Sequence, residues 1–486
     1  MERLTAGAVA EACGATVQAG SAETVVERVC TDSRQVQPGD LFVALRGPRF
    51  DGHEFVADAL ARGARAVMVE RGRAGEVNTQ AGAVLVVDDS LAALQRLAAW
   101  YRRRLRDAAV VAVTGSVGKT TTKEMVAAAL SGLGAVVKAP ASFNNEVGVP
   151  LVILAADPGT RALVLEIGMR GPGQIRHLAG VAAPTVGIVT NVGESHVGML
   201  GSVEAIARAK AELVESLQPG AVAVLNGDDE RVRAMARLAP DGVRVLTFGR
   251  GADCDVRLLA VEGGGLGGTR LELGYGGQRV ACRLAVPGRH MAINAAAAVA
   301  AALACGVELE AAARGLDGFS GAAMRMEVIR TADDIVLLND AYNASPTSMR
   351  AALETLARVA AEERRRAVAI LGDMLELGAL AEQAHRGIGR EAAERGVELL
   401  VAVGEMAAEM ASGAREAGAG AEMAIVTARD AEHAAAVACR QVQPGDAVLV
   451  KASRAMGLDR VVRELVQAHA PAGSNGGGVR EEAELT

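Results

Sequence analysis

The sequence VVAVTGSVGKTTTKEM, residues 110–125, organises the rest of this chain. Its apolar run Val110–Val113 predicts a buried strand, and a glycine-containing turn follows directly. Lys119 then precedes three threonines, and the helical pattern Met125–Leu130 comes next. A strand, a glycine turn, a lysine, a hydroxyl and a helix in this order are typical of a phosphate-binding loop.

This loop predicts how a nucleoside triphosphate would bind. Glycine lets backbone N–H groups approach phosphate oxygens, and the next helix offers unpaired N–H groups and the positive end of its dipole. Lys119 is expected on the β- and γ-phosphates, and the Thr120 hydroxyl on Mg²⁺. The full G-x-x-x-x-G-K-[ST] spacing would place its first glycine at Val113, so an ordinary glycine turn is the alternative. The expected nucleotide-binding residues of the loop are Thr114, Gly115, Ser116, Val117, Gly118, Lys119, Thr120 and Thr121.

Composition excludes several classes of protein. With 486 residues, two to four domains are expected, and at 2% aromatic residues the chain lacks base-stacking platforms. The net charge of -7 argues against a nucleic-acid partner or an anionic membrane surface, and no apolar run approaches the roughly 18 residues of a membrane span. The six cysteines form no C-x-x-C pair, and the N-terminus has no signal pattern, so we expect a cytoplasmic protein with free thiols. We also expect the protein to be a monomer.

Alternating strand-like and helical segments predict an α/β protein of three domains. Residues 1–88 form a small α/β domain, and residues 89–318 a central domain whose mostly parallel sheet carries the phosphate loop. Within it, residues 254–287 alternate between glycine turns and predict added antiparallel hairpins. Residues 319–470 predict a Rossmann-like domain without the G-x-G-x-x-G of a bound NAD, and 471–486 a disordered tail.

Several predicted strands end in polar residues. Because ligands bind beyond the carboxyl ends of parallel strands, Glu166 and His196 should share one crevice with the phosphate loop. Strands are predicted over 41–45, 66–70, 84–89, 161–169, 185–193, 221–229, 335–343, 367–375, 399–404 and 447–454. Helices are predicted over 54–63, 91–106 and 295–305.

Three polar residues of the central domain each have two interpretations. Glu166, beside Thr120, is either a Mg²⁺ ligand or a surface glutamate after a buried strand. His196 would position a second metal or a phosphate, or it is a structural histidine. Lys210 lies in the helical stretch AIARAKAELVESL and, on this pattern alone, is a solvated helix lysine.

Two polar stretches of the first domain are equally open to two interpretations. TDSRQVQPGD (31–40) and RGPRFDGHEF (46–55) mix charged and turn residues. They are either solvated loops or a surface for a polar ligand, with Arg34 and Arg49 facing phosphate.

Motifs over residues 25–465 resemble the Mur ligase family, which builds the peptide of bacterial cell-wall precursors. They are TGSVGKTT, FNNEVGVP (143–150), EIGM (166–169), TNVGESHVGMLGS (190–202), AKAEL (209–213), GRHMAINAAAA (288–298), MRME (324–327) and NDAYNASP (339–346). DSR, PGDLFVAL and DGHEF in the first domain and LGDMLELG…H (371–385) in the third resemble the members that join D-alanyl-D-alanine to UDP-N-acetylmuramoyl-tripeptide. The Asp-Asn-Pro-Arg motif of the sister ligase that adds a diamino acid is absent from the sequence.

The resemblance implies an ATP-dependent amide ligase with two Mg²⁺ ions and an acyl-phosphate intermediate. Lys119 and Arg325 would contact the phosphates, Asn294 the adenine and Asp340 the ribose. Thr120 and Glu166 would hold one Mg²⁺, with His196 near the second and a carbamate on Lys210 as a further metal ligand. Lys119, His196, Lys210 and Arg325 form the implied catalytic set. The implied substrate-binding residues are Ser33, Arg34, Asp51, Gly52 and His53 for the UDP end, and Asn144, Asn145, Tyr342, Asn343 and Ser345 for the acceptor side.

The chain departs from the family pattern at two positions. Met324 replaces the glycine before Arg325, and Ala452 replaces the glycine of Lys-Gly-Ser-Arg. Other interpretations are a sister Mur ligase, a folylpolyglutamate-type synthetase, or a nucleotide-dependent switch without amide chemistry. The separate first domain argues against the folate type, and the polar strand ends of all three domains argue against the switch.

Overall fold

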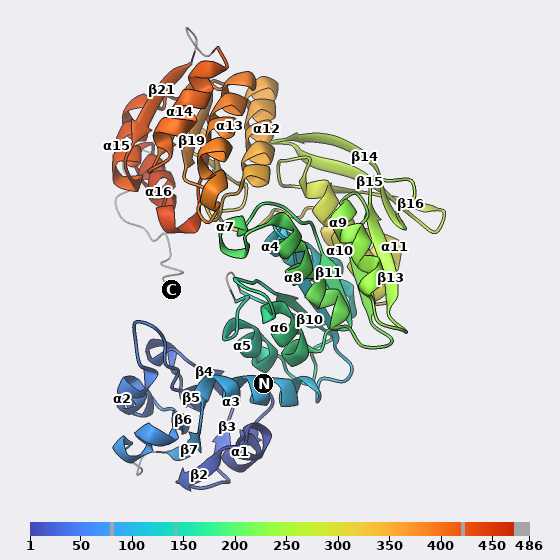
Figure 1. Ribbon diagram of the computed structural model, residues 1–486, viewed down its shortest axis with the longest axis vertical. Helices are drawn as coiled ribbons and strands as arrows, with labels where there is room; N and C mark the ends of the chain where they lie inside the picture. The colour runs from blue at the N-terminus through green and yellow to red at the C-terminus, as the bar shows by residue number, and fades with distance from the viewer. Residues whose placement is uncertain (78–81, 141–142, 419–422, 471–486) are drawn as a thin grey trace.

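The computed structural model describes residues 1–77, 82–140, 143–418 and 423–470. The stretch predicted as a disordered tail, 471–486, lies outside the described residues. Figure 1 shows three α/β domains in sequence order, with the N-terminal domain at the bottom, the central domain in the middle and the C-terminal domain at the top. Over the described ranges, no helix combines the length and the apolar character needed to cross a bilayer.

The N-terminal domain contains a five-stranded sheet in the order β2-β7-β6-β5-β4, with β1 and β3 paired separately. The predicted strands are confirmed with small shifts at their ends. The predicted helix 54–63 begins instead as a 3-10 turn, Gly52–Phe55, because the Asp51 carboxylate accepts the His53 N–H at 3.0 Å and starts the turn early. The strands are β1 Leu4–Thr5, β2 Thr16–Ala19, β3 Val25–Val26, β4 Arg28–Cys30, β5 Asp40–Val43, β6 Ala66–Glu70 and β7 Ala83–Val87, and the helices α1 Ala6–Cys13 and α2 Val56–Ala61.

Helix α3, Ser90–Arg102, joins this domain to the central one. It packs against α1 on one side and against central-domain helices on the other. The Tyr101 hydroxyl accepts the Glu2 N–H and donates to the Ala156 carbonyl, both at 2.9 Å. The helix ends at Arg102, before the predicted Arg106, and the buried Arg102 side chain donates to the carbonyls of Ala182 and Leu105.

The central domain is built on a nine-stranded sheet in the order β16-β15-β14-β13-β12-β11-β8-β10-β9. In this order, all neighbouring strands from β14 to β9 are parallel. The predicted antiparallel hairpins are confirmed as β14, β15 and β16. Strand β8 lies inside the sheet, which explains its fully apolar run. The strands are β8 Ala109–Thr114, β9 Val136–Lys138, β10 Ala162–Glu166, β11 Val186–Val189, β12 Val222–Asn226, β13 Arg244–Gly249, β14 Val256–Gly265, β15 Gly268–Tyr275 and β16 Gln278–Leu284. The helices are α4 Lys119–Ala129, α5 Gly148–Ala155, α6 Gln174–Ala182, α7 Val197–Leu200, α8 Val203–Glu215, α9 Glu230–Ala234, α10 Met291–Ala304 and α11 Leu309–Leu316.

The C-terminal domain has a six-stranded sheet in the order β17-β18-β22-β19-β20-β21, parallel except for β17. The four strands predicted here are confirmed, whereas β17 and β21 were not predicted. Both are edge strands with partly exposed side chains, so they lack the continuous apolar run of the inner strands. The strands are β17 Glu327–Arg330, β18 Val336–Asp340, β19 Ala367–Gly372, β20 Leu399–Val403, β21 Ala424–Ala428 and β22 Ala447–Lys451. The helices are α12 Pro346–Glu363, α13 Ala381–Glu394, α14 Ala407–Glu416, α15 Ala431–Gln441 and α16 Asp459–Ala468.

Two contacts hold the C-terminal domain against the central one. Helix α12 packs on β14, and α7 packs on the 3-10 turn Gly378–Leu380, which follows the loop after β19 (Figure 1). The carboxyl ends of β8, β10 and β11 therefore face the amino end of α12 and the loops of the other domain.

Candidate active site

A cavity of about 1070 Å³ lies between the central and C-terminal domains. Its central-domain wall comprises the phosphate loop, Asn144–Glu146, Glu166, His196, Lys210 and Asn294, and its C-terminal wall comprises Arg325, Asp340, Tyr342–Ser345, Leu375–Leu377 and Lys451. Parallel strands bring these segments together from distant parts of the sequence, as their polar ends predict.

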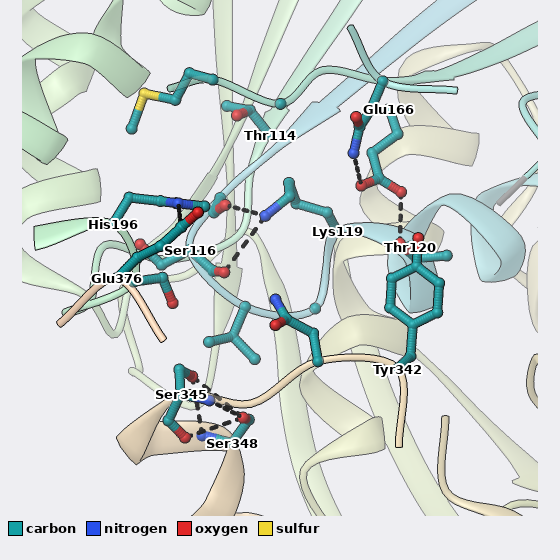
Figure 2. Close-up of a pocket in the computed structure, with 18 of the residues that line it drawn as sticks. Thr114, Ser116, Lys119, Thr120, Glu166, His196, Tyr342, Ser345, Ser348 and Glu376 are labelled. Carbon is teal, nitrogen blue, oxygen red and sulfur yellow. Dashed lines mark hydrogen bonds and ion pairs between the residues drawn. The ribbon is translucent and has the colours of Figure 1, made fainter. Parts of the chain in front are cut away.

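The phosphate loop connects β8 to α4 and has the features of an anion site. Gly118 is the N-cap of α4 and no side chain caps this end, so the first-turn N–H groups are free for a ligand. The Lys119 ammonium donates to the carbonyls of Gly115 at 2.8 Å and Ser116 at 3.4 Å, folding over the loop (Figure 2). The buried Thr114 hydroxyl has no hydrogen-bond partner among the described residues.

Neither Gly115 nor Gly118 leaves room for a side chain, because other residues lie close to both. Gly118 has a φ of +83°, and a Cβ there would lie 2.7 Å from Asn294 Oδ1. A Cβ on Gly115 would lie 1.8 Å from the Thr190 hydroxyl. Thr190 donates in turn to the Val117 carbonyl at 2.7 Å. The loop after β11 and helix α10 therefore fix the shape of the phosphate loop from outside it.

Glu166 ends β10, lines the cavity beside the phosphate loop and is 4% exposed. Its carboxylate accepts the Thr120 hydroxyl at 2.5 Å and the Asn144 amide at 2.9 Å (Figure 2). Burial alone would raise the pKa of Glu166, but Lys119, Arg325 and these two hydrogen bonds together hold it below its ordinary value. Glu166 is thus an ionised, pre-oriented carboxylate rather than a surface glutamate. The Asn144 side chain, expected on the acceptor side, points to this carboxylate.

Lys210 is 1% exposed and has no hydrogen-bond or ion-pair partner in the part of the chain that the structure describes. Burial, and then the positive charge of Lys119, lower the pKa of Lys210 well below its ordinary value. The prediction from the helix pattern that Lys210 is solvated is therefore wrong, because α8 turns Lys210 inward beside the cavity. A buried lysine with a lowered pKa loses its proton more readily than a solvated one, and the unprotonated amine is a nucleophile.

Residues from the C-terminal domain close the other side of the cavity. The Arg325 guanidinium lies 4.0 Å from the ring centroid of Tyr342, a cation–π contact. Asp340 pairs with the Lys451 ammonium at 2.6 Å and accepts the Met326 N–H at 3.1 Å. Met324, which stands where the family has glycine, has a φ of +58°, so the usual glycine suits a left-handed position.

The other expected acceptor-side residues shape the backbone. The Asn145 side chain accepts the Gly148 N–H at 2.8 Å, and Ser345 caps α12 in a capping box with Ser348 (Figure 2). The Asn343 carbonyl accepts a hydrogen bond from Lys451 at 2.8 Å. Ala452 is buried, its Cβ directed at Gly372, and it does not line the cavity.

His196 follows β11 and reaches the opposite domain. Its Nδ1 lies 2.5 Å from Glu376 Oε2, in the loop after β19 (Figure 2). The hydrogen bond from His196 lowers the pKa of Glu376. Sequence reasoning missed Glu376, although it lies within the motif LGDMLELG, because its partner is distant in sequence.

Two further cavity residues escaped the sequence interpretation. Lys451 ends β22 beside Asp340, and the strand-end rule would have found it. Arg170 follows the EIGM motif and lines the cavity with an exposed side chain.

The residues expected at the UDP end lie in the N-terminal domain, and none of them is among the described residues lining this cavity. Arg34 forms a two-pronged pair with Asp32 at 3.0 and 2.9 Å. The buried His53 contacts Asp51 at 2.5 Å through Nδ1 and accepts the Glu70 N–H at 3.0 Å through Nε2. His53 therefore orders the loop through Asp51. A Cβ on Gly52 would lie 2.7 Å from the Leu45 carbonyl oxygen, so this position has no room for a side chain. Ser33 begins the adjacent 3-10 turn. Arg49 is exposed.

Three family models match successive parts of the chain. They are described as the Mur ligase family, catalytic domain (residues 25–102), the Mur ligase middle domain (113–302) and the Mur ligase, glutamate ligase domain (324–454).

Curated relatives align with nearly the full chain. The UDP-N-acetylmuramoyl-tripeptide--D-alanyl-D-alanine ligase of Mycobacterium tuberculosis H37Rv is 38% identical over 96% of this chain and 98% of its own. The ligase of the same name from Bacillus subtilis is 36% identical over 92% and 94%.

Solved structures are also similar to this chain over most of its length. A crystal structure of MurF from Acinetobacter baumannii has a TM-score of 0.85 at 32% identity, covering 96% of this chain and 99% of that one. MurF ligase from Thermotoga maritima in complex with ADP has a TM-score of 0.75 at 29% identity, covering 91% and 98%.

Proposed function

The chain belongs to the Mur ligase family, and we propose that it joins D-alanyl-D-alanine to UDP-N-acetylmuramoyl-tripeptide with hydrolysis of ATP to ADP and phosphate. The product is a peptidoglycan precursor, so the enzyme serves cell-wall synthesis and, through it, cell shape and division. One observation carries the proposal: an uncapped helix N-terminus with its phosphate loop, and cationic side chains from two domains, face a single cavity.

The reaction follows from charge. The tripeptide carboxylate is a poor electrophile, so one of its oxygens first attacks the γ-phosphorus of ATP and ADP leaves. The amine of D-alanyl-D-alanine then attacks the carbonyl carbon of the acyl phosphate. The tetrahedral intermediate loses a proton from nitrogen and expels phosphate. Lys119 and Arg325 stabilise the negative charge of the transferred group.

The donor set around Glu166 fits Mg²⁺. Thr120 and Glu166 supply the hard oxygen ligands that this ion prefers. Within the described ranges there is no cluster of three His, Cys, Asp or Glu side chains, which suits an ion held by one carboxylate and by substrate phosphates. When bound, the ion would neutralise phosphate charge, and His196 would lie near a second ion.

Lys210 suits a carbamate. The unprotonated form of its buried amine, which the lowered pKa favours, can attack CO₂, forming an N–C bond and releasing one proton. The product is an anion that would offset Lys119 and present oxygen to a metal. This would remove the cost of a buried amine without a partner.

The remaining roles divide among the three domains, which we propose to be 1–88, 89–318 and 319–470. Ser33, Arg34 and the 51–53 loop bind the UDP end. Asn294 binds the adenine and Asp340 the ribose. Asn144, Asn145, Tyr342, Asn343 and Ser345 shape the acceptor side. We propose a cytoplasmic monomer, and closure of the C-terminal domain excludes water from the reaction.

The test is ADP release with UDP-N-acetylmuramoyl-tripeptide, Mg²⁺ and ATP, with and without D-alanyl-D-alanine, with the product read by mass spectrometry. ADP and a new amide that both require the dipeptide are expected. Dependence on a single amino acid instead would identify a sister ligase. ADP release independent of any acceptor would overturn amide ligation.

A further inference from the structure

The contact between His196 and Glu376 joins two domains at the edge of the cavity. Besides the side-chain contact at 2.5 Å, the Gly198 N–H donates to the Glu376 carbonyl at 2.9 Å. One residue of the C-terminal domain thus binds both a side chain and the backbone of the segment leading into α7.

The backbone on both sides is specialised for this contact. His196 and Glu376 have φ values of +67° and +64°, in the left-handed region that costs non-glycine residues free energy. A Cβ on Gly198 would lie 2.7 Å from the Gly378 nitrogen, and one on Gly378 would lie 2.9 Å from the Gly198 Cα. Two strained residues and two close glycines at one junction indicate a built contact rather than a chance encounter of surfaces.

The loop that carries Glu376 is itself firmly held. The Leu375 N–H donates to the Ser453 hydroxyl at 2.9 Å, and the Met374 N–H to His385 Nε2 at 2.8 Å. The Asp373 carboxylate accepts the N–H groups of Glu405 and Met406 at 2.8 and 3.1 Å. The Glu376 carboxylate is therefore presented by a rigid loop of the C-terminal domain.

On the other side, His196 ends a loop that is bonded to the phosphate loop. The Gly193 N–H donates to the Ser116 hydroxyl at 2.9 Å, and the Val117 N–H to the Asn191 side chain at 2.9 Å. The phosphate loop, the loop after β11 and the C-terminal domain are thus connected in series through His196. Both His196 and Glu376 line the cavity (Figure 2).

The chemistry of the pair decides which imidazole nitrogen is free. A carboxylate can only accept, so neutral His196 carries its proton on Nδ1 and keeps the lone pair on Nε2. Carboxylates commonly fix the tautomer and orientation of a histidine in this way.

We propose that Glu376 is a positioning residue, which fixes the orientation and the tautomer of His196, with the Nε2 lone pair left free, only when the C-terminal domain is docked. Domain docking thereby completes the catalytic site of the ligase proposed above, on which this inference rests. Glu376 acts through His196 and needs no contact with substrate.

The first test needs no substrate. Protein labelled with ¹⁵N-histidine is compared with Glu376→Ala at pH 8.5, and His196→Gln identifies the His196 signals. In the wild type, Nδ1 should be protonated and Nε2 unprotonated, and Glu376→Ala should shift the signals toward the other tautomer. Unchanged His196 signals in Glu376→Ala would overturn the inference. Because no acceptor is present, this result stands whether or not D-alanyl-D-alanine is the substrate.

The second test is a double-mutant cycle on ligation. Glu376→Ala should lower kcat by about 10- to 100-fold, the usual cost of removing such a partner, with a smaller loss in Glu376→Gln. Glu376→Ala combined with His196→Ala should be no worse than His196→Ala alone. Glu382→Ala, an exposed glutamate of α13 in the same domain, should match the wild type. Losses that multiply in the double variant would show that Glu376 acts independently of His196.

Discussion

The polar loops of the N-terminal domain and the cavity between the other two domains use similar residues in different ways. In the loops, charged groups find partners within their own domain, as Arg34 does with Asp32 and His53 with Asp51. In the cavity, Lys119 and Arg325 both lie near the Glu166 carboxylate, and Lys210, near Lys119, has no hydrogen-bond or ion-pair partner among the described residues.

The N-terminal loops are therefore a preformed binding surface, whereas the cavity lacks the negative charge that its ligand would bring. The N-terminal loops are already satisfied, so a ligand there meets an ordered surface that changes little on binding. The cavity brings Lys119 and Arg325 close enough for each positive charge to disfavour the other, which is costly until an anion enters. Changes in the cavity should therefore affect catalysis strongly, and changes in the loops should affect binding moderately.

Lys119→Ala should produce the largest effect. Among the described residues its ammonium bonds only carbonyls of its own loop, so the fold should survive while kcat/KM falls by about 10³-fold, the scale for a lost charge-stabilising donor. Steady-state ADP release measures it. Lys138→Ala, an exposed lysine of β9, is the matched control. A loss below tenfold would contradict the assigned role.

Lys210→Ala should come next, with a loss of about 100-fold, the scale for removing a group that supports a metal. Added short carboxylic acids should restore part of the activity, because they can fill the space of a carbamate. The same acids should leave Lys138→Ala unchanged. An active Lys210→Ala enzyme would exclude the carbamate.

Arg34→Ala should show a smaller and more selective effect. Loss of one charge-assisted hydrogen bond to the UDP end should raise the KM for UDP-N-acetylmuramoyl-tripeptide by about tenfold. The KM for ATP and kcat should stay near wild type, because the loop lies outside the cavity. Initial-rate kinetics separate these constants, with the exposed Arg62→Ala as control. An equal change in the KM for ATP would contradict the view that the N-terminal loops and the cavity bind separate parts of the substrates.

The last expected effect is on stability rather than on activity, and it is a gain. Lys210 has a lowered pKa when folded, so below its unfolded pKa of about 10.4 the unfolded chain binds the extra proton and stability is lost. In CO₂-free buffer at pH 7, Lys210→Met should unfold at a higher temperature, gaining on the order of 1–3 kcal/mol.

This gain should shrink as the pH rises toward about 10.4 and should vanish above it, where Lys210 is uncharged in both the folded and the unfolded chain. Thermal unfolding at several pH values measures it, and Arg62→Met, a change at an exposed cation, should show no such trend. A gain that is independent of pH would mean that packing, rather than charge, destabilises Lys210.

Much of the fold and part of the candidate site follow from local sequence. The phosphate loop is contiguous, and its strand, glycines, Lys119 and Thr120 define its geometry over a few residues. Inner parallel strands are continuous apolar runs, and their polar ends predict a shared crevice, as Glu166 and His196 illustrate. Edge strands such as β17 and β21 escape this reasoning because one side of them is partly exposed.

Tertiary packing decided the rest, because it depends on residues far apart in the chain. Lys210 looks solvated in its helix, yet it lies four residues after the buried Ile206 and three before the buried Leu213, so packing of α8 places it inside. The pairs of Asp340 with Lys451 and of His196 with Glu376 join residues more than one hundred positions apart. A helical or strand period specifies which face a residue occupies, but only the packed domains specify what that face meets.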